Sequence, residues 1–137
     1  MKKIFLPLFS AVLFLASCTK DDSGFDGPSL NDIYGDFSIL DSLSASAATV
    51  DFSAGQQLTF SAEFSKNVNW KIAITGNTSG AVYTIEGFSR LIDATNAIWD
   101  GSATTLPMFR SEDCVAQLTI DGEDDTLTAP VAVLGTK

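Results

Sequence analysis

Polar and apolar residues alternate with a period of two along most of the chain after residue 35. Every second residue is apolar in LTFSAEF (58–64), in VNWKIAI (68–74) and in CVAQLTID (114–121). This alternation is typical of β-strands that bury one face. The predicted inward faces carry Leu58, Phe60, Ala62, Phe64, Val68, Trp70, Ile72, Ile74, Cys114, Ala116, Leu118 and Ile120.

Weaker strand signals lie between and around these three segments, at 36–40, 49–53, 81–87, 97–99 and 127–134. Turn-forming sequences such as TGNTSG, WDGSATT and DGEDDT separate them. The half-polar strands favour antiparallel pairing, because parallel strands are usually buried on both faces. We therefore expect an all-β fold, an antiparallel β-sandwich of about seven strands.

The beginning of the chain has a different pattern. Two lysines precede a mostly apolar run at residues 4–16, which is shorter than the roughly 20 apolar residues of a membrane-spanning helix. A basic start, a short apolar run and small residues at the end of that run are typical of a cleaved signal peptide. The following segment is rich in Asp, Ser, Gly and Asn, as a flexible tether is. The predicted organisation is a signal peptide at 1–17, a tether at 18–34 and one domain at 35–137.

The end of this leader, Leu15-Ala16-Ser17-Cys18, resembles the lipobox of bacterial lipoproteins. In that family the leader is cut before the cysteine, which then carries acyl chains such as palmitate. Two or more acyl chains hold a protein stably to a bilayer, whereas one chain holds it only marginally. The resemblance thus implies that Cys18 is the lipid anchor.

The residues after Cys18 carry a second resemblance. Lys20, Asp21 and Asp22 are similar to the signal that sends Bacteroidota-type lipoproteins to the outer face of the outer membrane. This resemblance implies a protein anchored in the cell outer membrane and facing outward, and the alternative is a charged, solvated linker. Ser42 and Thr126 also fit the O-glycosylation pattern of these bacteria, although turn residues explain both equally well.

Residues 67–120 resemble the immunoglobulin-like domains of bacterial cell-surface proteins, including the domain of flagellar hook-capping proteins. The resemblance rests on Trp70 and Ile72 in a W-x-I strand, on the WDG turn at 99–101 and on the strand at 114–120. It implies an immunoglobulin-like sandwich with a buried tryptophan. The loop after WDG contains LPMF where those domains usually carry a glycine, so its geometry is expected to differ.

Composition narrows the possible chemistry. The chain has no histidine, and its seventeen acidic residues outnumber its eight basic ones. Without the leader the net charge is about −11, which argues against binding nucleic acid through clustered Lys and Arg. The lack of histidine removes Ser-His-Asp and Cys-His catalysis and the usual zinc sites. With Cys18 lipidated, Cys114 is the only free thiol, and we expect neither a catalytic residue nor a cofactor.

Two other kinds of site remain to be considered. The acidic turn DGEDDT (121–126) could offer carboxylates to calcium but lacks the spacing of a calcium loop, so no metal is expected. Sugar-binding sandwiches stack glycans on exposed aromatic rings. Trp70 is expected in the core by its strand phase, and Tyr34 falls in the tether, which leaves Tyr83 and Trp99. Trp99, beside a turn, is the candidate ligand-binding residue, although burial of its ring is the stronger expectation.

Together these features favour a non-catalytic, surface-anchored lipoprotein domain. It would act as a spacer or interaction module in a cell-envelope assembly such as one for glycan uptake. Its expected partners are the membrane, through the lipid anchor, and glycans or other envelope proteins. One alternative is a small glycan-binding lipoprotein, which would line an exposed face with aromatic rings. Another is an adhesin or pilus-type subunit, which would need a donor strand or an open groove.

Overall fold

The computed structural model describes residues 35–137. These residues form seven strands and one short 3-10 helix, η1. The elements are β1 (Ile39–Ala45), β2 (Thr49–Asp51), η1 (Phe52–Ala54), β3 (Leu58–Gly76), β4 (Val82–Ile92), β5 (Ile98–Trp99), β6 (Glu112–Ile120) and β7 (Thr126–Gly135). The predicted all-β class is therefore confirmed for this part of the chain. Among its elements there is no helix with the length and apolar character needed to cross a membrane.

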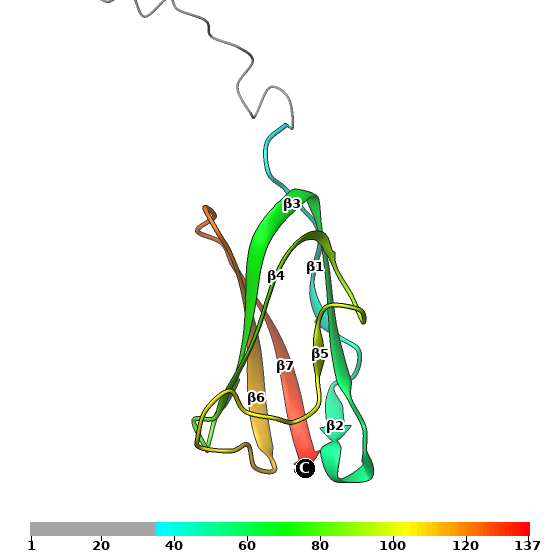
Figure 1. Cartoon of the computed structure of the whole chain (residues 1–137), viewed down its shortest axis with the longest axis vertical. Coiled ribbons are helices and arrows are strands. Elements are labelled where there is room, and N and C mark those ends of the chain that lie inside the picture. The colour runs from blue at the N-terminus through cyan, green and yellow to red at the C-terminus, as the bar shows by residue number, and fades with distance from the viewer. Residues whose placement is uncertain (1–34) are drawn as a thin grey trace, which may run out of the picture.

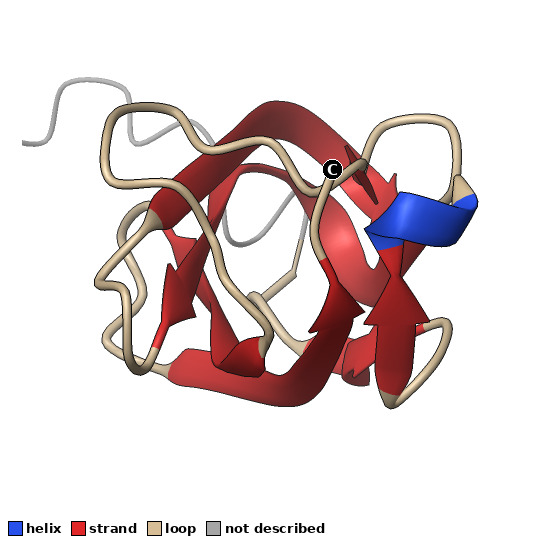
Figure 2. Cartoon of the chain, turned by 90° about the horizontal axis from the view of Figure 1, so that it is seen from below, coloured by secondary structure: helices blue, strands red, loops and turns tan. Residues whose placement is uncertain are grey.

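The strands form one mixed sheet that curls into a half-barrel (Figure 2). Its order is β1-β3-β6-β7-β2, while β4 and β5 pair with β3 outside this path. Strand β3 is long enough to arch over one end of the molecule, and β4 follows it (Figure 1). The first half of β3 pairs with β1, from Phe60 to Phe64, and the second half pairs with β6, from Trp70 to Gly76. One strand thus serves both sides of the half-barrel.

This arch corrects two expectations. The segments predicted as separate strands at 58–64 and 68–74 belong to the single strand β3, because no turn-forming Gly or Pro lies between them. The sheet is also not purely antiparallel, since β2 pairs with β7 in parallel, Val50 lying opposite Val133. The two halves of β3 run in opposite directions. Strand β2, which continues β1 after a short link, therefore meets β7 running the same way.

The core lies inside this curl. The predicted inward residues of β3 and β6 are buried, except that Val68 is only partly buried and packs at the margin of the core. Burying a large apolar side chain contributes about 1.5 to 3 kcal/mol, so the period-two faces supply most of the driving force for this fold. Buried together are Leu58, Phe60, Ala62, Phe64, Trp70, Ile72, Ile74, Cys114, Ala116, Leu118 and Ile120.

Glycines allow the tight turns between paired strands. Gly80, with φ at 70°, lies in the turn from β3 to β4, and Gly122, with φ at 83°, lies in the turn from β6 to β7. A positive φ is unfavourable for residues that carry a Cβ atom, which explains why glycine occupies both positions. These turns set the register of the two antiparallel pairs, for example Trp70 opposite Gly87.

Candidate functional site

Trp99, the candidate ligand-binding residue, has a fully buried side chain. Strand β5 pairs with the start of β3, Trp99 lying opposite Leu58, and this pairing turns the indole into the core. The ring packs edge-on between Phe52 and Phe109, with centroid distances of 4.8 and 4.7 Å. Its Nε1 donates to the carbonyl oxygen of Ser102 at 2.9 Å. Trp99 therefore offers no free ring face, and the burial that was the stronger expectation is what the structure has.

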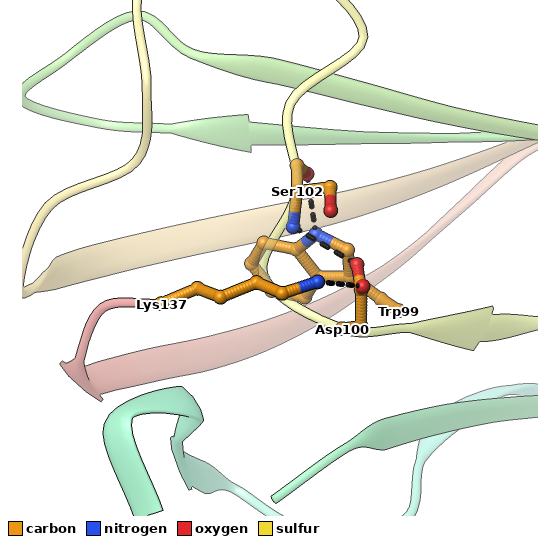
Figure 3. A network of polar contacts seen from close by, with 4 residues as sticks. All are labelled: Trp99, Asp100, Ser102 and Lys137. Atoms are coloured by element: carbon orange, nitrogen blue, oxygen red, sulfur yellow. Dashed lines mark hydrogen bonds and ion pairs between the residues drawn. The ribbon is translucent and has the colours of Figure 1, made fainter. Parts of the chain in front are cut away.

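The WDG turn is a structural corner (Figure 3). The Asp100 carboxylate accepts a hydrogen bond from the Ser102 backbone N–H at 3.1 Å and forms an ion pair with Lys137. The bonds from Lys137 and Ser102 lower the pKa of Asp100 to about 2. Gly101 is required here, because a Cβ atom would lie 2.6 Å from the Phe52 ring. The motif thus links the end of the chain to β5.

Trp70 is also unavailable for stacking. Its ring packs against Gly87 of β4, where a Cβ atom would lie only 2.4 Å from Cζ2, and its Nε1 donates to Ser89 Oγ at 2.9 Å. An open hollow of about 610 Å³ borders this contact. Its rim carries the exposed ion pair of Lys71 and Glu86, whose charged atoms are 3.6 Å apart. The hollow is therefore polar, and the one ring that borders it is buried.

Glu112 is the single buried charged residue in the described part of the chain. Its carboxylate accepts bonds from the backbone N–H of Thr78, of Ser79 and of Arg110 at 2.6, 2.8 and 3.0 Å, and another from Ser79 Oγ at 2.5 Å. Burial raises the pKa of this carboxyl, but the hydrogen bonds outweigh it and hold the pKa at about 2. Glu112 therefore stays ionised and fastens the β3–β4 turn to the start of β6.

Sequence reasoning missed Glu112, although a signal was present. It lies in the same period-two phase as Cys114 and Ala116, which places an acid on the inward face. The Cys114 thiol is buried as expected, and burial, with Glu112 and Asp113 nearby, raises its pKa to about 12. A thiol with so high a pKa is almost wholly protonated at neutral pH and a poor nucleophile.

Three of the exposed large apolar side chains lie on β4 and β5, the two strands outside the main path that pair with β3, and others lie elsewhere, Leu106 and Leu134 among them. We call Phe88, Leu91 and Ile98 the β4–β5 strip; they are 66%, 48% and 41% exposed. Phe88 and Leu91 belong to β4, and Ile98 belongs to β5. The sequence signal for Phe88 was its strand phase, which it shares with the charged residues Glu86 and Arg90 rather than with inward residues.

One edge of β4 is only partly covered. The carbonyl of Val82 accepts a bond from the Thr104 N–H at 2.8 Å, and the Thr84 N–H donates to Thr104 Oγ1 at 3.0 Å. Beyond Thr84, β4 has no strand partner on this side among residues 35–137. Because an unpaired edge exposes backbone donors and acceptors, this stretch is open to another chain.

The other predicted sites fall in three groups. Ser42 and Thr126 are exposed, and their O-glycosylation stays a prediction. The acidic turn at 121–126 is exposed, and residues 35–137 hold no group of three acidic or cysteine side chains placed for a metal ion. Four predicted residues lie outside the described residues: Cys18, for lipidation, and Lys20, Asp21 and Asp22, for export. Tyr34 lies outside them too.

Comparisons of the chain with protein-family models, with curated proteins and with solved structures gave no match. The functional argument therefore rests on the sequence and on the geometry of residues 35–137.

Proposed function

We propose that residues 35–137 are the non-catalytic interaction domain of a surface-anchored lipoprotein, held in the outer membrane through Cys18. The observation that carries this proposal is Phe88, a large apolar side chain that is 66% exposed on β4, beside the uncovered edge of that strand. Large apolar side chains that stay exposed next to unpaired backbone groups favour contact with another protein. A cell-envelope assembly, such as one for glycan uptake, would provide that contact.

The shape of the domain supports a spacer role as well. The first described residues lie next to the arch of β3, where the Ser38 N–H donates to Ser65 Oγ at 2.9 Å. Lys137 lies at the opposite end of the long axis, bound to Asp100 (Figure 1). A tether that entered at the arch would hold the rest of the domain away from the membrane.

The aromatic residues favour protein contact over glycan stacking. Trp70 and Trp99 are both buried, and Tyr83 is partly buried against the core. Sugar stacking requires an open ring face, and neither tryptophan offers one. The glycan-binding alternative therefore loses its candidate residue, whereas the β4–β5 strip keeps its apolar surface free.

The half-barrel is compatible with a variant of the immunoglobulin-like sandwich, and we include that finer fold in the proposal. One side holds β1, the first half of β3 and β5; the other holds β4, the second half of β3, β6, β7 and β2. A bent strand that serves both sides would replace the usual connection between two sheets. The parallel β2–β7 pair at the margin supports the same assignment.

Photo-crosslinking on intact cells tests the interaction role. A photoreactive residue at Phe88 should yield adducts with an envelope protein, because this side chain lies on the proposed contact surface. Leu134 is the matched control, since it is an apolar side chain 60% exposed on β7, which has strands on both sides. Equal adduct yields at the two positions, or none at Phe88, would contradict the proposal.

A further inference from the structure

The uncovered part of the β4 edge has a regular arrangement of backbone groups. Val82 and Thr84 direct backbone groups away from β3, as their bonds to Thr104 demonstrate. In an antiparallel pair, alternate residues face away from the neighbouring strand. The β3–β4 register runs without a shift from Thr75 opposite Val82 to Val68 opposite Ser89. The backbone groups of Glu86 and Phe88 therefore face away from β3, and Arg90 follows at the point where the register shifts.

The side chains of these three residues share one face. The inward face of β4 here carries Gly87, where a Cβ atom would meet the Trp70 ring, and Ser89, whose Oγ accepts from Trp70 Nε1. Glu86, Phe88 and Arg90 alternate with them and are exposed. An acidic residue and a basic residue thus stand at equal distances on either side of an exposed aromatic ring.

This order is complementary to itself, and we propose that β4 pairs antiparallel with β4 of a second copy, about a two-fold axis at Phe88. Glu86 of each copy would then lie opposite Arg90 of the other, and the two Phe88 rings would form a cross-strand aromatic pair. Opposite charges and aromatic pairs placed directly across from each other both stabilise a sheet. The inference rests on the proposed function, because it names the partner of the interaction domain.

The backbone supports the same register. With the axis at Phe88, the N–H of each Phe88 donates to the carbonyl of the other. Glu86 of each copy then lies opposite Arg90 of the other, two residues from the axis, and the backbone groups of Glu86 face the partner strand. The pairing would join the β4 sides of two half-barrels into a continuous sheet.

The charges decide which occupant fits. Charged side chains on an edge strand commonly prevent indiscriminate pairing. Here the two signs are placed so that a second copy meets the opposite sign at both positions. Arg90 now binds Glu63 at 2.8 Å, and Glu86 lies 3.6 Å from Lys71. These ion pairs are exposed, so the side chains can exchange partners at little cost.

Disulfide crosslinking tests the axis. Hydrogen-bonded residues in an antiparallel pair have Cα atoms about 5.5 Å apart, within the range that a disulfide spans. In the full-length protein in its membrane, Phe88→Cys should form a covalent dimer under mild oxidation. Leu134→Cys is the control and should remain monomeric, and Cys114 is buried in both. A monomeric Phe88→Cys protein would overturn the inference.

Charge reversal tests the register. In the Phe88→Cys background, Glu86→Arg or Arg90→Glu should each lower the crosslinking rate about tenfold, because each sets like charges opposite one another twice. The double variant should recover the parental rate, and the two single variants mixed together should crosslink with each other. Thermal unfolding of each variant checks that the fold is retained. Should the double variant and the mixture crosslink as slowly as the single variants, the proposed pairing is wrong.

The two proposals fail in different ways. If Phe88→Cys gives no dimer while photo-crosslinking at Phe88 captures another envelope protein, the interaction role stands and self-pairing is wrong. If neither experiment yields an adduct, the interaction role is wrong too.

Discussion

At the scale of single residues, Glu112 best illustrates how a buried charge is accommodated. Its carboxylate has no cationic partner among the described residues but accepts four hydrogen bonds, three of them from backbone N–H groups. Gly76 leaves the necessary space, because a Cβ atom there would lie 2.6 Å from Glu112 Oε1. A buried charge is tolerated when hydrogen bonds replace its hydration, and this one joins two turns that are distant in the sequence.

We expect Glu112→Gln to lower the free energy of unfolding by about 1 to 3 kcal/mol at pH 7, since a glutamine NH₂ group cannot accept bonds from the facing donors. The folded pKa of about 2 lies below the ordinary 4.5. The stabilisation should therefore be complete above pH 4.5 and disappear as the pH falls toward 2. Urea unfolding of both proteins across this range measures the difference.

The control is Glu123→Gln, which changes an exposed acid in the turn between β6 and β7. It should leave the free energy of unfolding nearly unchanged at every pH. A destabilisation by Glu112→Gln that stays constant from pH 7 to pH 3 would contradict the role assigned to the ionised carboxylate.

At the scale of elements, the contact between β3 and β4 depends on a ring and a missing side chain. Trp70 lies opposite Gly87, and its indole occupies the space that a side chain at Gly87 would need. The bond from Trp70 to Ser89 holds the ring in place. Since β4 also carries the proposed contact surface, this packing positions the exposed edge.

Gly87→Ala should destabilise the fold by about 1 to 3 kcal/mol, because the added Cβ atom would overlap the buried indole and force it to move. Chemical denaturation measures the loss, and the tryptophan fluorescence should shift to the red as Trp70 becomes more exposed. Thr84→Val, on the same strand but away from the ring, is the matched control. An unchanged midpoint and an unchanged spectrum would disprove the packing argument.

At the scale of the whole molecule, the predicted anchor would set where the domain works. Acids beside a membrane gain nothing from anionic headgroups, so Asp21 and Asp22 cannot strengthen the anchor itself. With Lys20 they are better explained as a sorting signal. The domain would then stand on the cell surface, with the uncovered β4 edge available to partners.

Replacing Lys20, Asp21 and Asp22 by Ala should leave lipidation intact but move the protein to the periplasmic face. Protease shaving of whole cells measures the change, and metabolic labelling with palmitate confirms the anchor. Cys18→Ser is the comparison variant, which should lose both label and anchoring. If the triple variant is shaved as readily as the parent, the segment is only a solvated linker.

The sequence by itself determined the strand phases and most of the core. Period-two alternation is a local property, so Phe60, Trp70, Ile72 and Leu118 could be placed inside without knowledge of any partner strand. The predicted leader and lipobox rest on local signals of the same kind and stay predictions. Burial of the Trp99 ring, beside a turn, was only the stronger of two expectations, and packing decided it.

The tertiary structure decided what depends on residues far apart in the chain. The arch of β3, the parallel β2–β7 pair and the ion pair between Asp100 and Lys137 all require knowing which segments meet. So do the hydrogen bonds that keep Glu112 ionised and the lack, within residues 35–137, of a second strand on the edge of β4 that faces away from β3 beyond Thr84. A strand pattern specifies which face is buried, but the order of strands is set by the packing of the whole core. That order is what leaves the edge at Phe88 uncovered.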